Sequence, residues 1–356
     1  MDFDLSAEQK ILRDSLSGLL ADMVDPARLV QMDAAQVDDL RAKIDAALFD
    51  MGLAGILVDE AAGGLGMGLL TLAVVAEELG RHAAPSGIVR NALAAWTLCQ
   101  AGEPAQKERW LPGLLDGRLR AAFAVQSAGG WSSDCWSAPA SDGLLRRRNV
   151  EGAQDAHVLI VGLEGPRLGI APGEAVVFDD RRAPLDATRP VTDITVPILS
   201  VDPLLASDSI VGRLRDAQLT LLAADAYGAG QRAFDMSVEY AKTRSQFDRL
   251  IGSFQGLKHQ LANLAVEIHP ARYLAWYAAH AWDTARRDAE HACALAKAHV
   301  PDVAVRTARA TVEAHGGIGY TWEYPLHLYL KRAMFDRVAW GGVDEHRARA
   351  ASLAEW

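Results

Sequence analysis

The chain has little cysteine, and neither an export signal nor a membrane anchor is expected from its sequence. Its 356 residues include only Cys99, Cys135 and Cys293, which form no CxxC pair and no metal-ligand spacing. A small and odd number of cysteines fits a reducing compartment. The N-terminus has no basic stretch followed by an apolar core, and no apolar run approaches the roughly 18–20 residues of a membrane span. We therefore predict a cytoplasmic protein with no membrane partner and no bound metal.

An excess of basic residues is also missing. The net charge is −10 and the isoelectric point is near 5.5, which disfavours nucleic acid as a partner because phosphate binding needs basic patches. The single basic run, Arg146–Arg148, is expected to be a solvated loop or strand end. Half of the residues are hydrophobic and 23% are charged, as in globular proteins. This length suits two or three packed units.

Motifs for dinucleotide binding and for serine hydrolysis are absent or misplaced. The string Gly228-Ala-Gly-Gln-Arg-Ala233 matches GxGxxA, but it lies inside a helical run instead of between a strand and a helix. The glycines of 64–68 lack the third glycine of the fingerprint. No GxSxG segment is present. Neither a Rossmann site nor a serine hydrolase is expected.

The order of elements is predicted to be helices, sheet, helices. Ser6–Gln9 is a capping-box pattern before a helical apolar stripe, and the glycines of 63–68 precede a third helix over about 69–80. Short apolar runs between Gly, Ser, Asp and Pro indicate a small antiparallel β unit. Long helices are expected over 214–242, 255–286 and 290–315, with kinks at Pro270 and Pro301. The predicted units are 1–118 (helical), 119–205 (β-sheet) and 206–356 (helical), an α+β fold that is mainly α.

The segment from Arg244 to Gln255 joins two of these helices and has the composition of a ligand site. A guanidinium is a planar fork that matches phosphate oxygens, the ring of Phe247 can lie against a planar ligand, and the amide of Gln255 can donate and accept. Farther along, His315 is followed by Gly316 and Gly317, where phosphates could approach the backbone without a Cβ in the way.

These motifs resemble those of one enzyme family. Tyr240-Ala-Lys-Thr-Arg-Ser-Gln-Phe247, Ile251-Gly-Ser-Phe-Gln255 and His315-Gly-Gly-Ile-Gly-Tyr-Thr-Trp-Glu323 resemble the C-terminal motifs of acyl-CoA dehydrogenases, and 102–117 resembles the end of their N-terminal domain. The resemblance covers nearly the whole chain, strongly at both ends and weakly in the middle. It implies an N-terminal helical domain, a middle β domain and a C-terminal four-helix bundle.

The resemblance also implies a cofactor and a reaction. Such enzymes bind FAD and desaturate an acyl-CoA thioester at the α,β bond, with the flavin as hydride acceptor and an electron-transfer protein as the next acceptor. Two departures, Asp248 and Glu313, place carboxylates near the expected pyrophosphate, which is electrostatically unfavourable. The residues that would contact FAD, largely across a subunit interface, are Arg244, Phe247, Ile251, Gln255, Glu313, Gly316 and Gly317.

The catalytic base of the family is not found. One family position aligns with Trp340 and the other lies near Gln218, and neither side chain can abstract an α-proton. Asp225 lies two helical turns beyond Gln218, roughly 10 Å away, too far for a simple replacement. The other acids near these two positions are Asp216, Asp344 and Glu345. No catalytic residue is therefore assigned.

The middle of the chain departs furthest from the family. The stretch 124–134 keeps little of the usual Thr-Glu-Pro…Gly-Ser-Asp segment. The chain thus keeps the half of the flavin site that reaches across an interface and weakens its own half. This favours one subunit of a hetero-oligomer, such as a heterotetramer, whose homologous partner supplies the carboxylate. With its Asp344–Arg347 tail, the chain resembles the smaller subunits of bacterial steroid-CoA dehydrogenases.

Two alternatives remain open from the sequence. The chain could be a self-sufficient homo-oligomer with a relocated base. It could also be a catalytically inactive subunit that binds acyl-CoA or serves as a scaffold.

Overall fold

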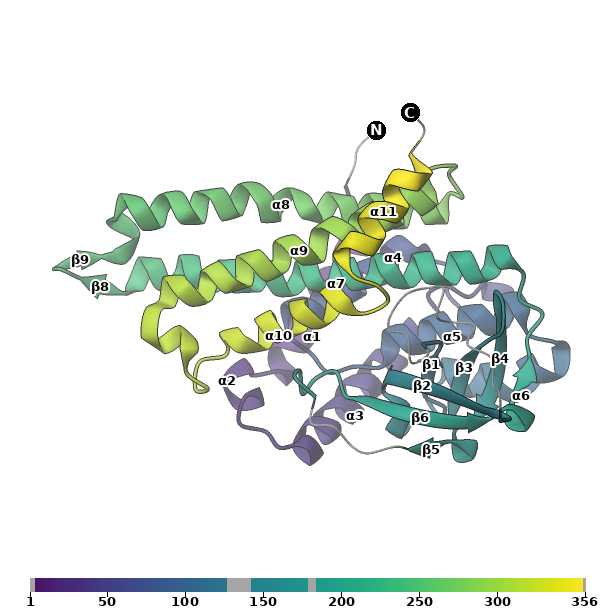
Figure 1. The fold of residues 1–356 in the computed structure, drawn as a ribbon. Helices are drawn as coiled ribbons and strands as arrows, with labels where there is room; N and C mark the ends of the chain where they lie inside the picture. Colours follow the sequence, from purple (N-terminus) through teal and green to yellow (C-terminus); the bar gives the residue numbers. More distant parts are fainter. Residues whose placement is uncertain (1–3, 127–141, 179–183, 355–356) are drawn as a thin grey trace.

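The computed structural model describes residues 4–126, 142–178 and 184–354. Along the chain, a group of helices is followed by two small sheets and then by a bundle of long helices (Figure 1). The fold is a mainly helical α+β arrangement, as the sequence predicts. None of the helices in the described ranges combines the length and the hydropathy needed to cross a membrane.

The N-terminal helices are fixed by caps and by apolar faces. Ser6 and Gln9 exchange side-chain and backbone hydrogen bonds in the predicted capping box, and Asp33 and Gln36 form a second one. The helix predicted over 69–80 spans Gly68–Arg81 and buries nearly all of its residues. The helices of this part are α1 (Ala7–Met23), α2 (Pro26–Leu29), α3 (Ala34–Asp50), α4 (Gly68–Arg81), α5 (Ile88–Ala101) and α6 (Pro104–Leu115).

The β region forms two sheets, and one strand pairing corrects the prediction of an antiparallel unit. One sheet has the order β1-β3-β4-β7 and the other β2-β6-β5. In the first sheet β1 and β3 run parallel, with Ala121 opposite Val158. The connection between them contains β2, so the chain returns in the same direction before it pairs. The strands are β1 (Ala121–Ala124), β2 (Leu144–Glu151), β3 (Val158–Leu163), β4 (Arg167–Pro172), β5 (Val177–Phe178), β6 (Val191–Pro197) and β7 (Asp202–Pro203).

The basic run also differs from the expectation. Arg146 and Arg148 are exposed on β2, but Arg147 is buried because successive side chains of a strand point to opposite faces. Its Nε donates to the carbonyl of Ala124 at 3.1 Å and its Nη2 to that of Gly162 at 2.5 Å. Burial lowers the pKa of Arg147 to about 10.

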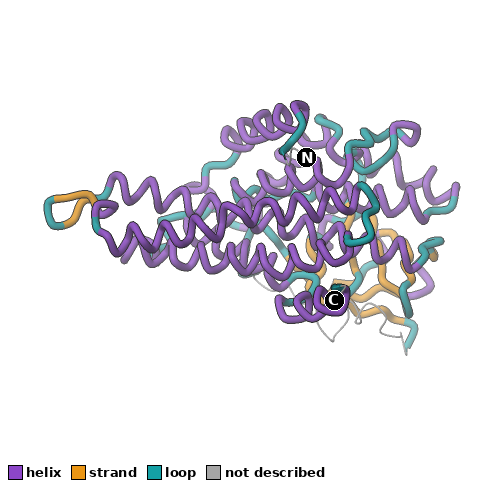
Figure 2. The backbone as a smooth tube through the Cα atoms, turned by 90° about the horizontal axis from the view of Figure 1, so that it is seen from above, coloured by secondary structure: helices purple, strands orange, loops and turns teal. Residues whose placement is uncertain are grey.

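The C-terminal part is built on three long helices, which run side by side in Figure 2. They are α7 (Asp208–Thr243), α8 (Gln255–Asp283) and α9 (Ala289–His315), followed by α10 (Leu326–Val338) and α11 (Val343–Leu353). The first begins six residues earlier than predicted, because Ser207 caps it by accepting from the Ile210 N–H. Pro270 and Pro301 lie inside α8 and α9, which continue through them.

The GxGxxA string serves helix packing. A Cβ on Gly228 would lie 1.9 Å from the carbonyl oxygen of Glu77 in α4. A Cβ on Gly230 would lie 2.8 Å from the Cβ of Ala304 in α9. Because neither contact leaves room for a side chain, these two glycines let α7 approach α4 and α9 closely.

Candidate functional site

The segment between α7 and α8 is a hairpin at one end of the bundle, at the left of Figure 1. Arg244 ends α7, and its carbonyl accepts from the Ile251 N–H at 2.8 Å, which closes the strands β8 (Ser245–Gln246) and β9 (Arg249–Leu250). Phe247 and Asp248 form the turn with φ of 52° and 60°. This left-handed conformation, uncommon for residues other than glycine, leaves the Phe247 ring 86% exposed.

A stack of rings brings the end of α9 to the same place. The ring centroid of Tyr240, on α7, lies 4.4 Å from that of His315, and the ring centroid of Tyr324 lies 5.0 Å from that of His315. His315 is buried, and burial lowers its pKa. The following Gly316 has φ of 62°, and a Cβ at Gly316 or Gly317 would meet nothing within 4 Å. The backbone here is open to a ligand or to another chain.

The seven residues predicted to contact FAD therefore gather at one end of the molecule. Arg244 is exposed and makes no ion pair within the described ranges, so its guanidinium is available. The exposed carboxylates of Asp248 and Glu313 lie at the same end. A free arginine, an outward ring and glycines without neighbours fit the edge of a planar, phosphate-bearing group such as FAD. These features are exposed, so they could contact FAD held by a neighbouring chain. For all seven residues this contact stays a prediction.

The two positions that align with the family base meet in one small cavity of the chain itself. Gln218 of α7 and Trp340, just after α10, line it together with Phe123, Gln126 and Asn149. The Trp340 ring packs edge-on against Phe123, with centroids 6.1 Å apart. Trp340 and Asn149 both have positive φ, 59° and 50°, and such strained backbone tends to gather at functional sites. The cavity volume is only about 20 Å³.

Among the described residues, the one carboxylate that lines this cavity is that of Glu151, at the end of β2. Its Oε1 accepts from Arg90 at 2.5 Å and from Arg189 at 3.1 Å. Burial acts to raise the pKa of Glu151, but Arg189 and Arg90 outweigh it and the pKa is lowered. A carboxylate held this way is a poor base. Glu151 could not be identified from the sequence, since no motif marks it and both of its arginine partners are distant in the chain.

A second cavity of about 20 Å³ lies beside the first and is lined by Gln218 and Asp225. Asp225 accepts two hydrogen bonds of 2.7 Å from Arg332 and one of 2.6 Å from Arg189. Asp336 is fully buried, and burial and the neighbouring Asp225 raise its pKa well above the ordinary value of a carboxyl. We call the following side chains the buried ion-pair network: Arg90, Glu151, Arg189, Asp225, Arg332 and Asp336.

The other acids considered from the sequence lie elsewhere. Asp216 is buried, accepts from Arg349 at 2.8 Å, and its pKa is raised by burial. The side chain of Asp344 is 99% exposed. Glu345, half-buried, approaches the backbone at Gly341. None of these three acids lines the two cavities. The stretch 127–134 and Cys135 lie outside the described residues.

Hydrogen bonds from buried side chains hold the turn that carries Trp340. Lys297 of α9 is fully buried and donates to the carbonyls of Arg337 at 3.1 Å and Gly341 at 2.9 Å. Burial lowers the pKa of Lys297 to about 7. The ring Nε2 of His346 lies 2.8 Å from the carbonyl of Trp340. These bonds fix the indole as a wall of the cavity.

Comparison with known proteins assigns the family. The model of the acyl-CoA dehydrogenase N-terminal domain matches residues 6–118, and that of the C-terminal domain matches 216–352. The acyl-CoA dehydrogenase IpdE2 of Mycobacterium tuberculosis is 30% identical over 334 residues, which cover 92% of this chain and 91% of the relative. The chain belongs to the acyl-CoA dehydrogenase family.

Solved structures agree with this assignment. A steroid acyl-CoA dehydrogenase, Tcur3481-Tcur3483, is 27% identical, with a TM-score of 0.86 over 97% of both chains. The butyryl-CoA dehydrogenase of Megasphaera elsdenii has a TM-score of 0.81 over 99% of both chains, at 22% identity, which shows the shared fold. Among the described residues, no three His, Cys, Asp or Glu side chains form a group that could hold a metal ion.

As a member of this family the chain is an FAD-dependent oxidoreductase that acts on acyl-CoA thioesters. FAD, when bound, supplies the hydride acceptor, and the protein must supply orientation and a base. In this chain Arg244 and Phe247 are suited to orient such a group. In the part of the chain that the structure describes, no residue that lines the cavity at Gln218 and Trp340 provides a free carboxylate.

Proposed function

We propose that this chain is one subunit of a hetero-oligomeric acyl-CoA dehydrogenase. A homologous partner subunit supplies the catalytic carboxylate and most of the flavin and substrate site. This chain adds Arg244, Phe247 and the Gly316–Gly317 turn across the interface. The observation that carries the proposal is the cavity at the two positions where the family places its base, which is small and offers no free carboxylate among its described lining residues.

The cavities near Gln218 are too small to hold the substrate. Pockets for drug-sized ligands measure about 300–1,000 Å³, whereas each cavity near Gln218 has a volume of about 20 Å³. Such a space holds about one water molecule. A fatty acyl chain or a sterol ring system does not fit in that space, and Arg90 and Glu151 of the buried ion-pair network form part of its wall. Removing one partner of a buried ion pair typically costs about 3–5 kcal/mol.

The described side chains at these cavities are also unsuited to act as the catalytic base. A general base must be free to take a proton. Glu151 is bound by two arginines and Asp225 by two as well. Trp340 and Gln218 cannot act as bases. These positions therefore support structure in this chain, and α-proton abstraction is left to the partner.

The outward-facing end is a further argument. Large apolar side chains are exposed near the hairpin, including Phe247 (86%), Tyr320 (74%) and Trp322 (71%). Clustered exposed aromatics mark interaction sites more often than free surface. A neighbouring subunit that covers them would place its flavin against Arg244. We further propose a bulky CoA thioester as the substrate of the complex, because one similar solved structure is a steroid acyl-CoA dehydrogenase.

The test compares the chain purified alone with the chain co-expressed with homologous partner chains encoded near it. Mass measurement gives the assembly, and the flavin absorption band gives the bound cofactor. We expect little flavin on the chain alone. With the correct partner we expect a yellow hetero-oligomer whose flavin is bleached by an acyl-CoA substrate.

A yellow homo-oligomer that oxidises an acyl-CoA without any partner would contradict the proposal and support a self-sufficient enzyme. A hetero-oligomer that forms but never binds flavin would instead support an inactive scaffold subunit. In the partner, the glutamate or aspartate at the position that aligns with Trp340 or Gln218 should be the base. Its substitution should abolish turnover while the flavin stays bound.

A further inference from the structure

Two parts of the predicted flavin contact lie on different helices, and one pair of rings joins them. Arg244 caps the end of α7, and Gly316 follows directly after the end of α9. Tyr240 lies one helical turn before Arg244, about 6 Å of helix rise, and its carbonyl accepts from the Arg244 N–H at 2.9 Å. His315 is the residue before Gly316. The contact between Tyr240 and His315 therefore sets where Arg244 lies relative to the glycine turn.

The rings of Tyr240 and His315 are stacked. Their centroids lie 4.4 Å apart and their planes differ by 20°, a stacked geometry of the kind that aromatic pairs favour. His315 is only 4% exposed, so its ring is shielded from water. Because one ring belongs to α7 and the other to α9, the pair opposes sliding of one helix end past the other.

Hydrogen bonds on two edges hold the His315 ring in this plane. Its Nδ1 lies 2.8 Å from the carbonyl oxygen of Thr311, and because a carbonyl only accepts, Nδ1 carries the proton and donates. In the neutral ring Nε2 is then the acceptor for the Tyr324 hydroxyl, at 3.3 Å. Burial lowers the pKa of His315, which favours the neutral ring.

The backbone near the two helix ends is closely packed as well. A Cβ on Gly319 would lie 2.5 Å from the carbonyl oxygen of Val312 and 3.1 Å from the Cβ of His315, so the glycine turn folds back onto α9. A Cβ on Gly252, just after the hairpin, would lie 2.7 Å from the carbonyl oxygen of Ala241, in the last turn of α7. Both segments are therefore fixed to the helix ends that the ring pair joins.

We propose that His315 is a positioning residue, which through its stack on Tyr240 holds Arg244 and the Gly316–Gly317 turn at the spacing that the edge of FAD requires. His315 itself does not reach the flavin, because its ring is buried whereas Arg244 and both glycines are exposed. This inference rests on the proposed function and adds the residue that orders this chain's share of the flavin contact. Without the stack the contacting groups remain but are less well placed, and they bind more weakly.

The test measures FAD affinity by titrating FAD into the deflavinated hetero-oligomer and following flavin fluorescence. His315→Leu removes the ring and should weaken FAD binding about fivefold. Tyr240→Leu removes the other, half-buried ring and should give the same loss. His315→Phe keeps a ring against Tyr240 and should stay within about twofold of wild type. In the Arg244→Ala complex, His315→Leu should weaken binding by less than about twofold more, because the spacing that it sets no longer matters.

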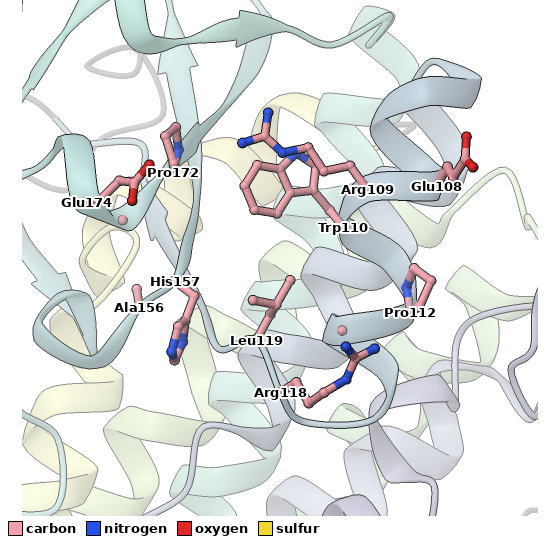
Figure 3. A pocket seen from close by; sticks show the side chains of 12 residues that line it. Glu108, Arg109, Trp110, Pro112, Arg118, Leu119, Ala156, His157, Pro172 and Glu174 are labelled. Carbon is pink, nitrogen blue, oxygen red and sulfur yellow. The ribbon is translucent and has the colours of Figure 1, made fainter.

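The matched control is His157→Leu, the same change at a histidine far from the hairpin. His157 is exposed in a cleft between α6 and the β region (Figure 3). In Figure 1, α6 lies at the opposite end of the molecule from β8 and β9. FAD affinity should be unchanged in this variant, and a loss as large as that of His315→Leu would count against a specific role of His315.

Three further results would overturn the inference while the proposed function stands. They are unchanged FAD affinity in His315→Leu and Tyr240→Leu, equal losses in His315→Leu and His315→Phe, and losses from His315→Leu and Arg244→Ala that multiply, as independent effects do. The mass of each assembly and its circular dichroism separate weaker binding from lost folding. A wild-type hetero-oligomer that binds no FAD would instead contradict the proposed function, and this inference with it.

Discussion

At the scale of single residues, the candidate site depends on side chains whose ionisation is set by burial. Lys297 is the clearest case, because it is fully buried and its ammonium group bonds two carbonyls below the Trp340 turn. Desolvation lowers its pKa to about 7, against the partial opposition of Asp336 and Glu345. The folded state therefore loses this proton at a lower pH than the unfolded state.

The consequence is a pH dependence of stability. Below about pH 7 Lys297 is protonated in both states, and the cost of burying its charge is fully present. Between pH 7 and its ordinary pKa of 10.5 the unfolded chain binds more protons, so the free energy of unfolding rises with pH. The slope from one such group is at most about 1.4 kcal/mol per pH unit.

Lys297→Met should remove this contribution. Urea unfolding at pH 6.5 and at pH 9 should show that the wild type gains stability relative to the variant as the pH rises. An identical pH dependence in the two proteins would mean that the lysine titrates normally.

At the scale of elements, close helix contacts decide how α7 places Gln218 and Asp225 at the two small cavities. Gly228→Ala places a methyl group where the Glu77 carbonyl stands 1.9 Å away, so α4 and α7 must separate. We expect a loss of at least about 1–3 kcal/mol from this overpacking. Gly212→Ala, in the same helix, meets only the end of Arg215 at 3.8 Å and should be neutral or stabilise by up to about 1 kcal/mol. Thermal unfolding of both variants checks this, and equal melting temperatures would contradict it.

The elements also show what the sequence could predict. Local signals were sufficient for the capping box at Ser6 and for the long helices, because caps and apolar periodicity are properties of neighbouring residues. The parallel pairing of β1 with β3 was missed, since strand order depends on partners far along the chain. Arg147 was expected in solvent, yet the alternation of side chains along β2 turns it inward.

At the scale of the whole molecule, the buried ion-pair network joins the three parts of the chain. Arg90 lies on α5, Glu151 on β2, and Asp225 on α7. Arg332 of α10 also donates to the carbonyl of Ala84 at 3.0 Å. The pair Arg332 and Asp225 is 107 positions apart. Such a network is invisible to sequence patterns, although Gln218 and Trp340 at its edge were identified by resemblance.

Removing one member should therefore loosen the whole fold. Asp225→Asn leaves Arg332 and Arg189 without their shared carboxylate, and we expect a loss of about 3–5 kcal/mol. Glu267→Gln, which breaks the exposed pair with Arg306, should cost less than about 1 kcal/mol. Denaturant unfolding gives both values, and equal losses would show that the network does not hold the parts together.

The central claim is that Arg244 serves a flavin held mainly by a neighbouring subunit. It is tested most directly by the flavin content of the co-purified complex carrying Arg244→Ala. Arg249→Ala is the matched control, because Arg249 is an exposed arginine of the same hairpin that is not predicted to contact FAD. Its guanidinium lies 4.6 Å over the ring of Phe254 in the same chain. For Arg244→Ala we predict an intact assembly that binds flavin about tenfold more weakly, because one charge-assisted contact to phosphate is lost. For Arg249→Ala we predict near-normal flavin binding. Unchanged flavin content and unchanged reduction by substrate in the Arg244→Ala complex would contradict the claim.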